Sequence, residues 1–551
     1  MTVHTPDQEG HSATNTRPRF EVVADGQGIC SHVGAALLAE LSDRLGLTCE
    51  LGRRANLGLR AGAHDRGQVL RDLVVMLADG GDCVSDLAAL RDQPDLFGTV
   101  CSTPTAWRVL AEELPDDPRG IAGLWSALAR VREHAWAAGA APVGLLILDV
   151  DATLIDAHSD KQGAAPTYKH GFGFHPLGCW LDREDGNGEA LAAILRPGNA
   201  AANTAQDHLD VLAMALLALP KHVRDQPILV RADSAGATHA FTNDLVRRNL
   251  QFSIGFDLDQ RVQTAILALP EQAWQPALDP DGRPRTGAWV AELSDLDLSS
   301  AGWPKGIRAI CRRERPHPGA RHKMAFTDAA GHRFQAFITN QPDPDPAILE
   351  TRHRPHSHVE DRIRTAKASG LRNLPFADFG ANDAWLTLVM IAQTLVCWAQ
   401  VLLLDGDLKV AEPKTLRYRL WHTAGRVVYH ARRVIVRIDR AWPWAADLIT
   451  AFAGYGPCLP AADPAPYLAV VASLPARTGH SLLDCDCHGQ VQLHRPSQSG
   501  QPRPMGPADP GQTADTAWHV NPSGTRKPCD RLPSCNSRNI EAKGTPRSLR
   551  D

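Results

Sequence analysis

The segment LILDVDATLIDAHSDKQ, at residues 146–162, places acidic side chains where a hydrophobic strand ends. Residues 143–150 are predicted to form a buried strand, because a short, β-branched apolar run lies between a proline and a polar turn. Side chains alternate along a strand, so Asp149, Asp151 and Thr153 would share one face. Neighbouring carboxylates repel each other, and burying them is costly unless a cation lies nearby. The pattern indicates either a divalent metal site or strand-end acids that cap the turn.

A second acid follows another hydrophobic strand. The segment PILVRAD at 227–233 is predicted to be a strand, and Asp233 ends it before a turn of small residues. Ligands of open α/β sheets gather at the carboxyl ends of strands, so Asp233 would lie beside the first acids. The alternative is that Asp233 only caps the helix expected at 237–249.

A third acid stands in the segment HSHVEDRIRTAKASGLRNLPF at 356–376. A helix is predicted to begin here, and polar side chains spaced four, four and three residues apart would lie roughly on one face: His356, Glu360, Arg364 and Lys367. A carboxylate among cations suits a site that holds both a metal and a phosphodiester. Two Mg²⁺ ions about 4 Å apart, or Mn²⁺ in their place, would be bridged by such carboxylates. Glu360 could equally be a solvated surface acid.

Composition limits the classes that remain. The chain has 551 residues, an apolar content of 43% and a charged content of 22%, which are typical of a globular protein with a large core. Its length suggests roughly three or four structural units. The net charge of −4 means that a nucleic acid would have to be held by local basic patches. Twelve cysteines without a spaced CxxC pair are typical of reduced thiols in the cytoplasm, and the polar N-terminus predicts no secretion signal.

The changing periodicity predicts how the chain is divided. Helical patterns give way after Pro142 to strands that alternate with helices, which favours an α/β sheet with helices on its faces. The expected order is a disordered N-terminus (1–18), a helical domain for DNA binding or dimerisation (19–140), the first part of an α/β core (141–256), an all-β insertion (257–340), the second part of the core (341–410), a basic DNA-contacting region (411–474) and a disordered tail (475–551).

One apolar run could be interpreted as a membrane span. Residues 385–404, WLTLVMIAQTLVCWAQVLLL, are uncharged and long enough to cross a membrane. Glutamine and threonine side chains dilute the run, and the sequence holds no second one. We therefore expect a buried core helix and no membrane contact.

A locally basic segment follows at 414–440, KTLRYRLWHTAGRVVYHARRVIVRIDR. It contains Lys414 and seven arginines against the single acid Asp439, with aromatic residues between them. Such a stripe is typical of contact with a phosphate backbone, although an ordinary solvated face can look the same. The candidate DNA contacts are Arg417, Arg419, Arg426, Arg432 and Arg433.

Four stretches make the chain resemble bacterial insertion-sequence transposases with a DDE catalytic triad: LDVDATLIDAHSDKQGAAPTYKHGFGFHPL, LVRADSAG, HSHVEDRIRTAKASGLRNLPF and LRYRLWHTAGRVVYHARRVIVRI. Among these it is most similar to the "thirteen-eighty" group, which is related to the larger set of IS-four-type transposases. The resemblance covers about residues 30–450. It depends on the order and spacing of the acids and on the β insertion between the second and third.

The resemblance implies a ribonuclease-H-like α/β core and a set of catalytic acids. The first acid of such enzymes lies in a D-x-T pattern, here Asp151-Ala152-Thr153, and the other two map to Asp233 and Glu360. Asp149 remains an alternative first ligand. Lys367 matches a lysine that follows the glutamate by seven residues in the related set, whereas His356 stands where that set has an arginine.

The resemblance also implies an activity and its partners. Enzymes of this family cut double-stranded DNA at the terminal inverted repeats of a transposon, and the 3′-hydroxyl then attacks target DNA. Two Mg²⁺ ions would support both reactions. Bringing two DNA ends together generally requires at least a homodimer, which would work in the bacterial cytoplasm at the nucleoid.

The insertion offers one further DNA contact. It carries three tryptophans beside the cationic run Arg312-Arg313-Glu314-Arg315, and these rings could simply form a small core. In related enzymes the insertion holds the transposon end and stacks an aromatic ring on a flipped base. That makes Trp289, which follows the glycine-rich turn DGRPRTGAW, the candidate.

Two other classes compete with the transposase. The D-x-D-x-T pattern that begins at Asp149 also fits haloacid-dehalogenase-type phosphatases, in which the first aspartate is the nucleophile. Such enzymes have a later strand that ends in paired acids, and the nearest segment, at 402–412, instead follows a long apolar run. A non-catalytic DNA-binding regulator would use the acids only structurally, so replacing Asp233 would leave its function intact.

Overall fold

The computed structural model describes residues 22–54, 64–117, 119–158, 160–183, 185–315, 331–430 and 433–454. The segments 1–18 and 475–551, which we predicted to be disordered, lie outside these residues, and so does Arg432. In the described part the fold is mixed α/β. Its strands form one nine-stranded mixed sheet and two three-stranded sheets.

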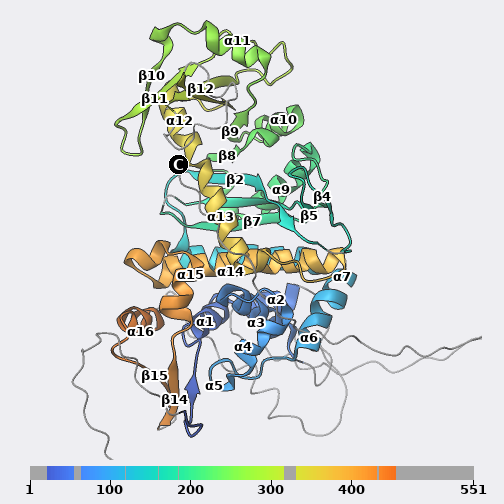
Figure 1. Ribbon diagram of the computed structural model, residues 1–551, viewed down its shortest axis with the longest axis vertical. Coiled ribbons are helices and arrows are strands. Elements are labelled where there is room, and N and C mark those ends of the chain that lie inside the picture. Colours follow the sequence, from blue (N-terminus) through green and yellow to red (C-terminus); the bar gives the residue numbers. More distant parts are fainter. Residues whose placement is uncertain are drawn as a thin grey trace, which may run out of the picture. The chain divides into compact units, whose positions relative to one another are not determined.

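Five neighbouring strands of the large sheet carry or flank the predicted acids (Figure 1). Their bounds are β2 Leu146–Ala152, β6 Leu177–Asp182, β7 Gly188–Ile194, β8 Ile228–Ala232 and β9 Gln251–Phe256. On one side of β2 lie β8 and β9, both parallel to it, and on the other side lie β6 and β7 in antiparallel order. The strands predicted near 143–150, 227–233 and 251–256 are therefore present, shifted by at most a few residues.

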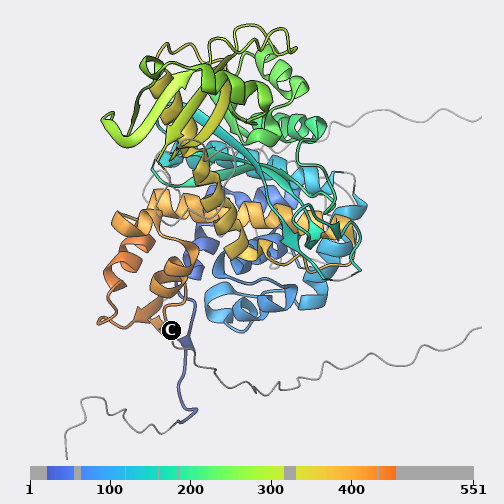
Figure 2. The same ribbon diagram turned by 45° about the horizontal axis from the view of Figure 1, so that its top comes forward.

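Residues 257–340 extend this sheet instead of forming one of their own (Figures 1 and 2). The added strands are β10 Gln275–Leu278, β11 Pro284–Glu292, β12 Arg308–Glu314 and β13 Arg333–Thr339, and β13 pairs with β9. The segment also contains helix α11 (Gln260–Ala268), so the prediction that it is all-β was wrong. The signals for this helix were in the sequence: Asp259 caps it, and Val262 and Ile266, four residues apart, are buried.

The other helices and strands of the described chain complete the fold. Before β2 stand β1 Ile29–Cys30, α1 Ala35–Leu45, α2 Leu47–Arg54, α3 Arg66–Asp79, α4 Ala88–Arg91, α5 Pro94–Phe97, α6 Thr103–Arg108, α7 Leu114–Asp116 and α8 Gly120–Ala135. After β2 stand β3 Ile155–Asp156, β4 Ala165–Pro166, β5 Phe172–Phe174, α9 Ala205–Ala218, α10 His239–Arg247, α12 Pro346–His353, α13 His358–Ala366, α14 Phe379–Leu403, α15 Pro413–Leu416, β14 Gly425–His430, β15 Arg433–Ile438 and α16 Ala445–Ala453.

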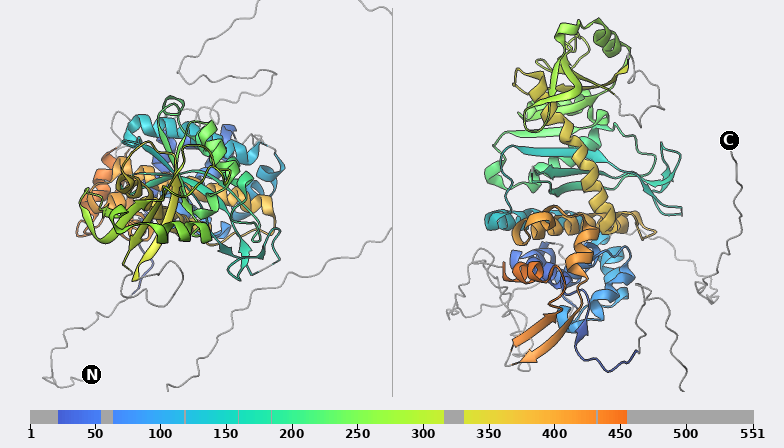
Figure 3. Two further views of the ribbon diagram at one scale, coloured as in Figure 1. Left: turned by 90° about the horizontal axis from the view of Figure 1, so that it is seen from above. Right: turned by 60° about the vertical axis from the view of Figure 1, so that its left-hand side comes forward.

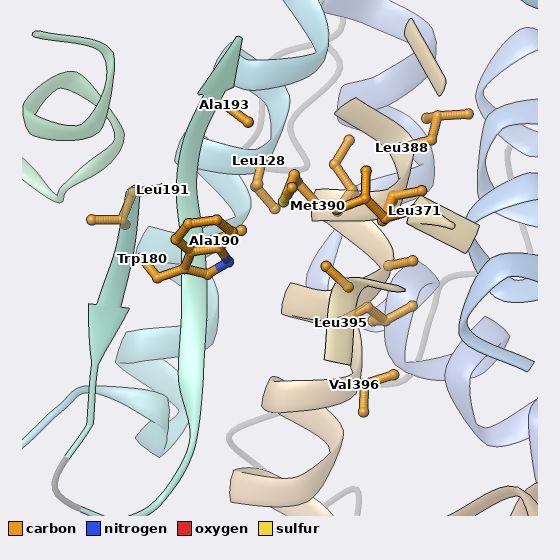
Figure 4. Close-up of a cluster of buried hydrophobic side chains, with 14 of the residues drawn as sticks. Leu128, Trp180, Ala190, Leu191, Ala193, Leu371, Leu388, Met390, Leu395 and Val396 are labelled. Atoms are coloured by element: carbon orange, nitrogen blue, oxygen red, sulfur yellow. The ribbon is translucent and has the colours of Figure 1, made fainter. Parts of the chain in front are cut away.

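Helix α14 is the long apolar helix, and it lies between the large sheet and the N-terminal helices (Figure 3). It contacts β7 on one side and α3 and α8 on the other. Figure 4 shows Met390 of α14, Leu128 of α8 and Ala190 of β7 in one cluster of buried hydrophobic side chains. The N-terminal helices and the central strands therefore share one hydrophobic core, and a second, smaller cluster lies between the strands of 257–340 and α12.

Several polar side chains of α14 also have hydrogen-bond partners inside the protein. Trp180 donates its indole N–H to Gln393 (3.1 Å), and the backbone N–H of Ala190 donates to the hydroxyl of Thr394 (3.2 Å). Within the most apolar 18-residue stretch of the helix, 89% is buried inside the protein. The run at 385–404 is thus a core helix, as expected, and its composition is explained by packing.

One buried carboxyl on this helix should make stability depend on pH. Burial raises the pKa of Asp383 from 3.8 to about 6, although its hydrogen bond from the Leu195 N–H opposes the shift. Because the folded-state pKa lies above the unfolded one, stability should fall as pH rises from about 4 through 6. Asp383→Asn removes this penalty, which is at most about 3 kcal/mol. We expect the variant to melt at a higher temperature than wild type at pH 8 and at the same temperature at pH 4.

Candidate active site

Three carboxylates from three separate elements line one cavity of about 380 Å³. Asp151 lies in β2, Asp233 directly follows β8, and Glu360 lies in the first turn of α13. In the parallel pair of β2 and β8, Val150 is opposite Ala232. The next residues, Asp151 and Asp233, therefore lie side by side at the same edge of the sheet. The cavity therefore brings together the three acids that the sequence pattern singled out.

The electrostatics of this cavity favour a cation. Burial raises the pKa of the Asp151 carboxyl from 3.8 to about 6; the charge of His356 lowers it, while Asp233 and Glu360 raise it again. The carboxylates of Asp233 and Glu360 are exposed to solvent. Three carboxylates that repel one another form an all-oxygen donor set, which fits Mg²⁺ or Mn²⁺. The oxygens of these three acids do not all lie within 4.8 Å of one another. Among the described residues, two other groups of potential ligands meet that distance.

Asp149 does not line the cavity, although it lies on the same face of β2. It is 1% exposed, and its two oxygens accept hydrogen bonds from Arg231 at 2.7 and 2.6 Å. Oδ1 also lies 2.8 Å from Nδ1 of His356. Asp149 is therefore not placed to be the first metal ligand, which was the alternative, because both of its oxygens already form a buried ion pair. The same ion pair argues against the phosphatase, which would need Asp149 as a free nucleophile.

This ion pair belongs to a buried network that links the strands to α13. Arg231 donates a further hydrogen bond to Asp182 at the end of β6 (2.6 Å). Asp182 also lies 3.5 Å from His358 and 3.4 Å from Arg362, both on α13. The network thus fixes the helix that carries Glu360 against the strands that carry the other two acids.

His356 connects the network to the cavity. Burial alone would lower the pKa of its imidazole, but the hydrogen bond and charge of Asp149 outweigh this and raise the pKa above its ordinary value. Its ring lines the cavity beside Asp151 and Glu360. His356 can therefore present a cationic N–H to an anion bound there.

The other two residues of the predicted helical face do not reach the cavity. The ammonium group of Lys367 donates a hydrogen bond to the Leu154 carbonyl (3.1 Å). Arg364 forms ion pairs with Asp361 (2.6 Å) and Glu412 (3.2 Å). The predicted single face fails at these two residues because Arg364 is held by acids outside the cavity, and because Lys367 lies beyond the end of α13 in a π-helical turn.

Several cavity residues were missed by the sequence reasoning: Tyr168, Lys169, His175 and His208. The first three belong to the stretch that follows the first acid, PTYKHGFGFHPL. Tyr168 and Lys169 are exposed, with the ammonium group 5.5 Å from the ring centre. A tyrosine, a lysine and a histidine close behind a strand-end acid were the available signal.

A second cavity of about 600 Å³ shares Asp233, His356 and Glu360 with the first. It continues over the strands of 257–340, where Arg285 and Arg312 line it. These arginines are partly neutralised, since Arg312 pairs with Glu350 (2.7 Å) and Arg285 with Glu314 (3.4 Å). Asp233 and Glu360 therefore lie where the first cavity meets a groove that continues over these strands.

Trp289 lies outside both cavities. It is opposite Arg313 in the β11–β12 pair, so its side chain is on the face of the sheet opposite to Arg312, which lines the groove. Its ring stacks with Arg313 (5.1 Å) and Arg315 (5.7 Å). The strand period thus turns Trp289 away from the groove, and its role as a base-stacking residue stays a prediction.

The predicted basic segment contains two arginines with structural roles. Arg417 donates to the carbonyls of Ala78 (3.2 Å) and Ala368 (2.8 Å), and burial lowers the pKa of its guanidinium group. Arg419 lies over the ring of Trp444, 4.9 Å from its centre. Arg417 is therefore removed from the candidate DNA contacts, because it caps the carbonyl ends of neighbouring segments.

The rest of this segment forms an exposed hairpin of β14 and β15, with β1 on its other edge. Arg426 is directly opposite Arg437, and His430 is opposite Arg433. All four side chains are exposed and lie on one face. Like charges opposite each other destabilise a strand pair, so this face, named here the basic face of the hairpin, favours a bound polyanion.

The comparison with known proteins is informative at the level of the sequence. A family model described as "Transposase DDE domain group 1" matches residues 12–454. No curated protein matches the chain. Among solved structures, the chain is similar to the cryo-electron microscopy structure of a piggyBac transposase synaptic complex with hairpin DNA, with 11% identity and a TM-score of 0.35 over 71% of this chain and 79% of that one. A likeness of that size bears on neither fold nor function.

Proposed function

The chain belongs to group 1 of the DDE transposase family, and we propose that it cuts DNA at the ends of an insertion sequence and joins these ends to target DNA. The observation that carries this proposal is the single cavity lined by Asp151, Asp233 and Glu360. These acids come from distant parts of the chain, and a purely structural role would not require them to converge on solvent. The "thirteen-eighty" group remains our proposal for the branch.

The topology supports a ribonuclease-H-like core as part of this proposal. The strand order β7-β6-β2-β8-β9, with two antiparallel and then two parallel neighbours, places the first two acids on adjacent central strands. The segment between β9 and α12 would then be an insertion that enlarges the sheet beside the site. The groove that runs over it offers a path for the DNA next to the cut.

We further propose that Asp151, Asp233 and Glu360 hold Mg²⁺, with Mn²⁺ as a substitute, as two ions. When bound, such ions lower the pKa of water and stabilise the charge on the leaving oxygen. The remaining work falls to the chain's own side chains. Lys169 and His356, which line the cavity, would orient the phosphate by charge-assisted hydrogen bonds, and the buried network would keep α13 in register with the strands.

The partners follow from this reaction. They are double-stranded DNA carrying terminal inverted repeats, target DNA and a second copy of the chain, since two ends must be joined together. The setting would be the bacterial cytoplasm, at the nucleoid. The direct test is a plasmid that carries the inverted repeats flanking the gene, incubated with the protein and Mg²⁺. Excised ends and strand-transfer products support the proposal, and their absence with intact DNA binding would favour a regulator.

The basic face of the hairpin should contribute to DNA affinity without reading sequence. The double variant Arg433→Gln and Arg437→Gln should weaken binding equally for transposon-end and unrelated DNA, because phosphate contacts carry no sequence information. The slope of log affinity against log salt should fall by about one unit for each phosphate that the protein no longer neutralises. A matched control is Arg261→Gln, an exposed arginine on α11 that is paired with Asp259. An unchanged slope in the double variant would make this face an ordinary solvated surface.

A further inference from the structure

A second group of potential metal ligands lies far from the proposed active site along the chain. His32 follows β1, Asp79 ends α3, and His422 lies between α15 and β14. Their ligand atoms all lie within 4.8 Å of one another. Nδ1 of His32 is 2.5 Å from Asp79 Oδ2, Nε2 of His422 is 3.2 Å from Asp79 Oδ1, and the imidazole centres are 4.5 Å apart.

Asp79 is a buried carboxylate between two imidazoles. Its side chain is 5% exposed, and Oδ1 lies 3.2 Å from Nε2 of His422 without a well-aligned hydrogen bond, because the same nitrogen is 3.1 Å from the Asp79 backbone carbonyl. Both histidines and Asp79 line a cavity of about 400 Å³, together with Asp86. A buried carboxylate whose Oδ1 has only a poorly aligned donor is costly, and a cation held by Asp79 and the two imidazoles would lower that cost.

We propose that His32, Asp79 and His422 bind a divalent transition-metal ion, with zinc as the preferred ion. Two imidazoles and one carboxylate are a donor set that suits Zn²⁺, whereas the all-oxygen set of the proposed active site suits Mg²⁺. Water would supply the fourth position, since Asp86 already accepts hydrogen bonds from the N–H groups of Asp82 and Cys83. The guanidinium of Arg417 lies near, but its hydrogen bonds are directed at the carbonyls of Ala78 and Ala368.

The backbone around the group supports a structural role for this site. Val33 donates its N–H to the carbonyl of Thr423 (3.1 Å), so the segments that carry the two histidines are already paired. β1 also pairs with β14 beside them. A metal here would fasten the N-terminal strand, the end of α3 and the basic hairpin to one another, and it would stabilise the folded state by binding.

The first test measures zinc stoichiometry in the full chain after removal of metals with a chelator. All proteins carry Asp233→Asn and Glu360→Gln, which keeps zinc out of the proposed active site. Relative to this parent, His422→Ala and His32→Ala should each lose one equivalent of bound zinc and the zinc-induced rise in Tm. His430→Ala, an exposed histidine on the same hairpin, should keep both. Equal stoichiometry and equal Tm shifts in all variants would overturn the proposal and leave an ordinary carboxylate–imidazole pair.

A second variant keeps the test decisive if removal of a ligand unfolds the protein. His422→Cys retains a zinc ligand, so the stoichiometry should not change. After loading with Co²⁺, this variant should show an additional thiolate-to-metal absorption band in its difference spectrum against the parent. Cys485, Cys487 and His488, outside the described residues, are present in both proteins and cancel in the difference. A spectrum identical to that of the parent would contradict ligation by residue 422.

Discussion

Asp233→Asn is expected to reduce Mg²⁺-dependent strand cleavage by at least about a thousandfold while leaving DNA affinity nearly unchanged. The side chain is exposed and only caps a short turn through the Ala235 N–H (3.0 Å), which asparagine can also do. The fold should therefore survive, and the loss should come from one missing charge among the three carboxylates. Glu360→Gln should behave in the same way, since Glu360 is exposed on α13.

Each of these variants has a neighbour that serves as its control. Asp225 precedes β8, at the end of the strand away from Asp233, and it is exposed and lines neither cavity. Asp361 is adjacent to Glu360 and lines a different cavity. Asp225→Asn and Asp361→Asn should cleave within about threefold of wild type, because surface changes away from a site have small effects. If Asp233→Asn kept its cleavage activity, or if the controls lost theirs as well, the three acids would not form the active site.

The edge of the sheet that carries the acids could be predicted from local patterns. Buried, β-branched runs before Asp151 and Asp233 identified β2 and β8, because such runs between turn residues have few other interpretations. Parallel neighbours then place their carboxyl ends together. The pairing of these two acids thus required only periodicity and a general rule about α/β sheets.

The distinction between Asp149 and Asp151 could not be predicted from the same patterns. Both are aspartates on one face of one strand, and only a partner on the neighbouring strand separates them. That partner is Arg231, the single charged residue within the apolar run ILVRA of β8. A charge inside a buried strand indicates a buried opposite charge, but the register that joins Arg231 to Asp149 is a tertiary property.

The direction of long side chains was the other feature that the sequence did not predict. Counting charge at 414–440 treated all arginines alike, yet Arg417 reaches the carbonyl of Ala78, far away in the sequence, while Arg433 faces solvent. Trp289 was chosen from the turn before it, and the strand period then placed it on the face opposite to the groove. In both cases the backbone position was compatible with the prediction, but the direction of the side chain could not be read from the local sequence.

Asp149→Asn should separate structural from catalytic carboxylates by its effect on stability. Asparagine leaves Arg231 short of one buried counter-charge and His356 without its anionic acceptor. Breaking a buried ion pair in this way costs about 3–5 kcal/mol, and the remaining bond from Arg231 to Asp182 puts the expected value near the lower limit. The measurement is the free energy of unfolding in denaturant, without metal.

Asp151→Asn is the matched comparison, two residues further along the same strand. Burial already disfavours the charge of Asp151, whose pKa is raised to about 6, so its neutralisation should leave stability unchanged or slightly higher at pH 7.5. Cleavage should be lost in this variant, whereas Asp149→Asn should retain measurable cleavage at temperatures at which it is folded. A stable but inactive Asp149→Asn protein would reverse the two roles, because only a ligand or a reacting group can be lost without weakening a buried network.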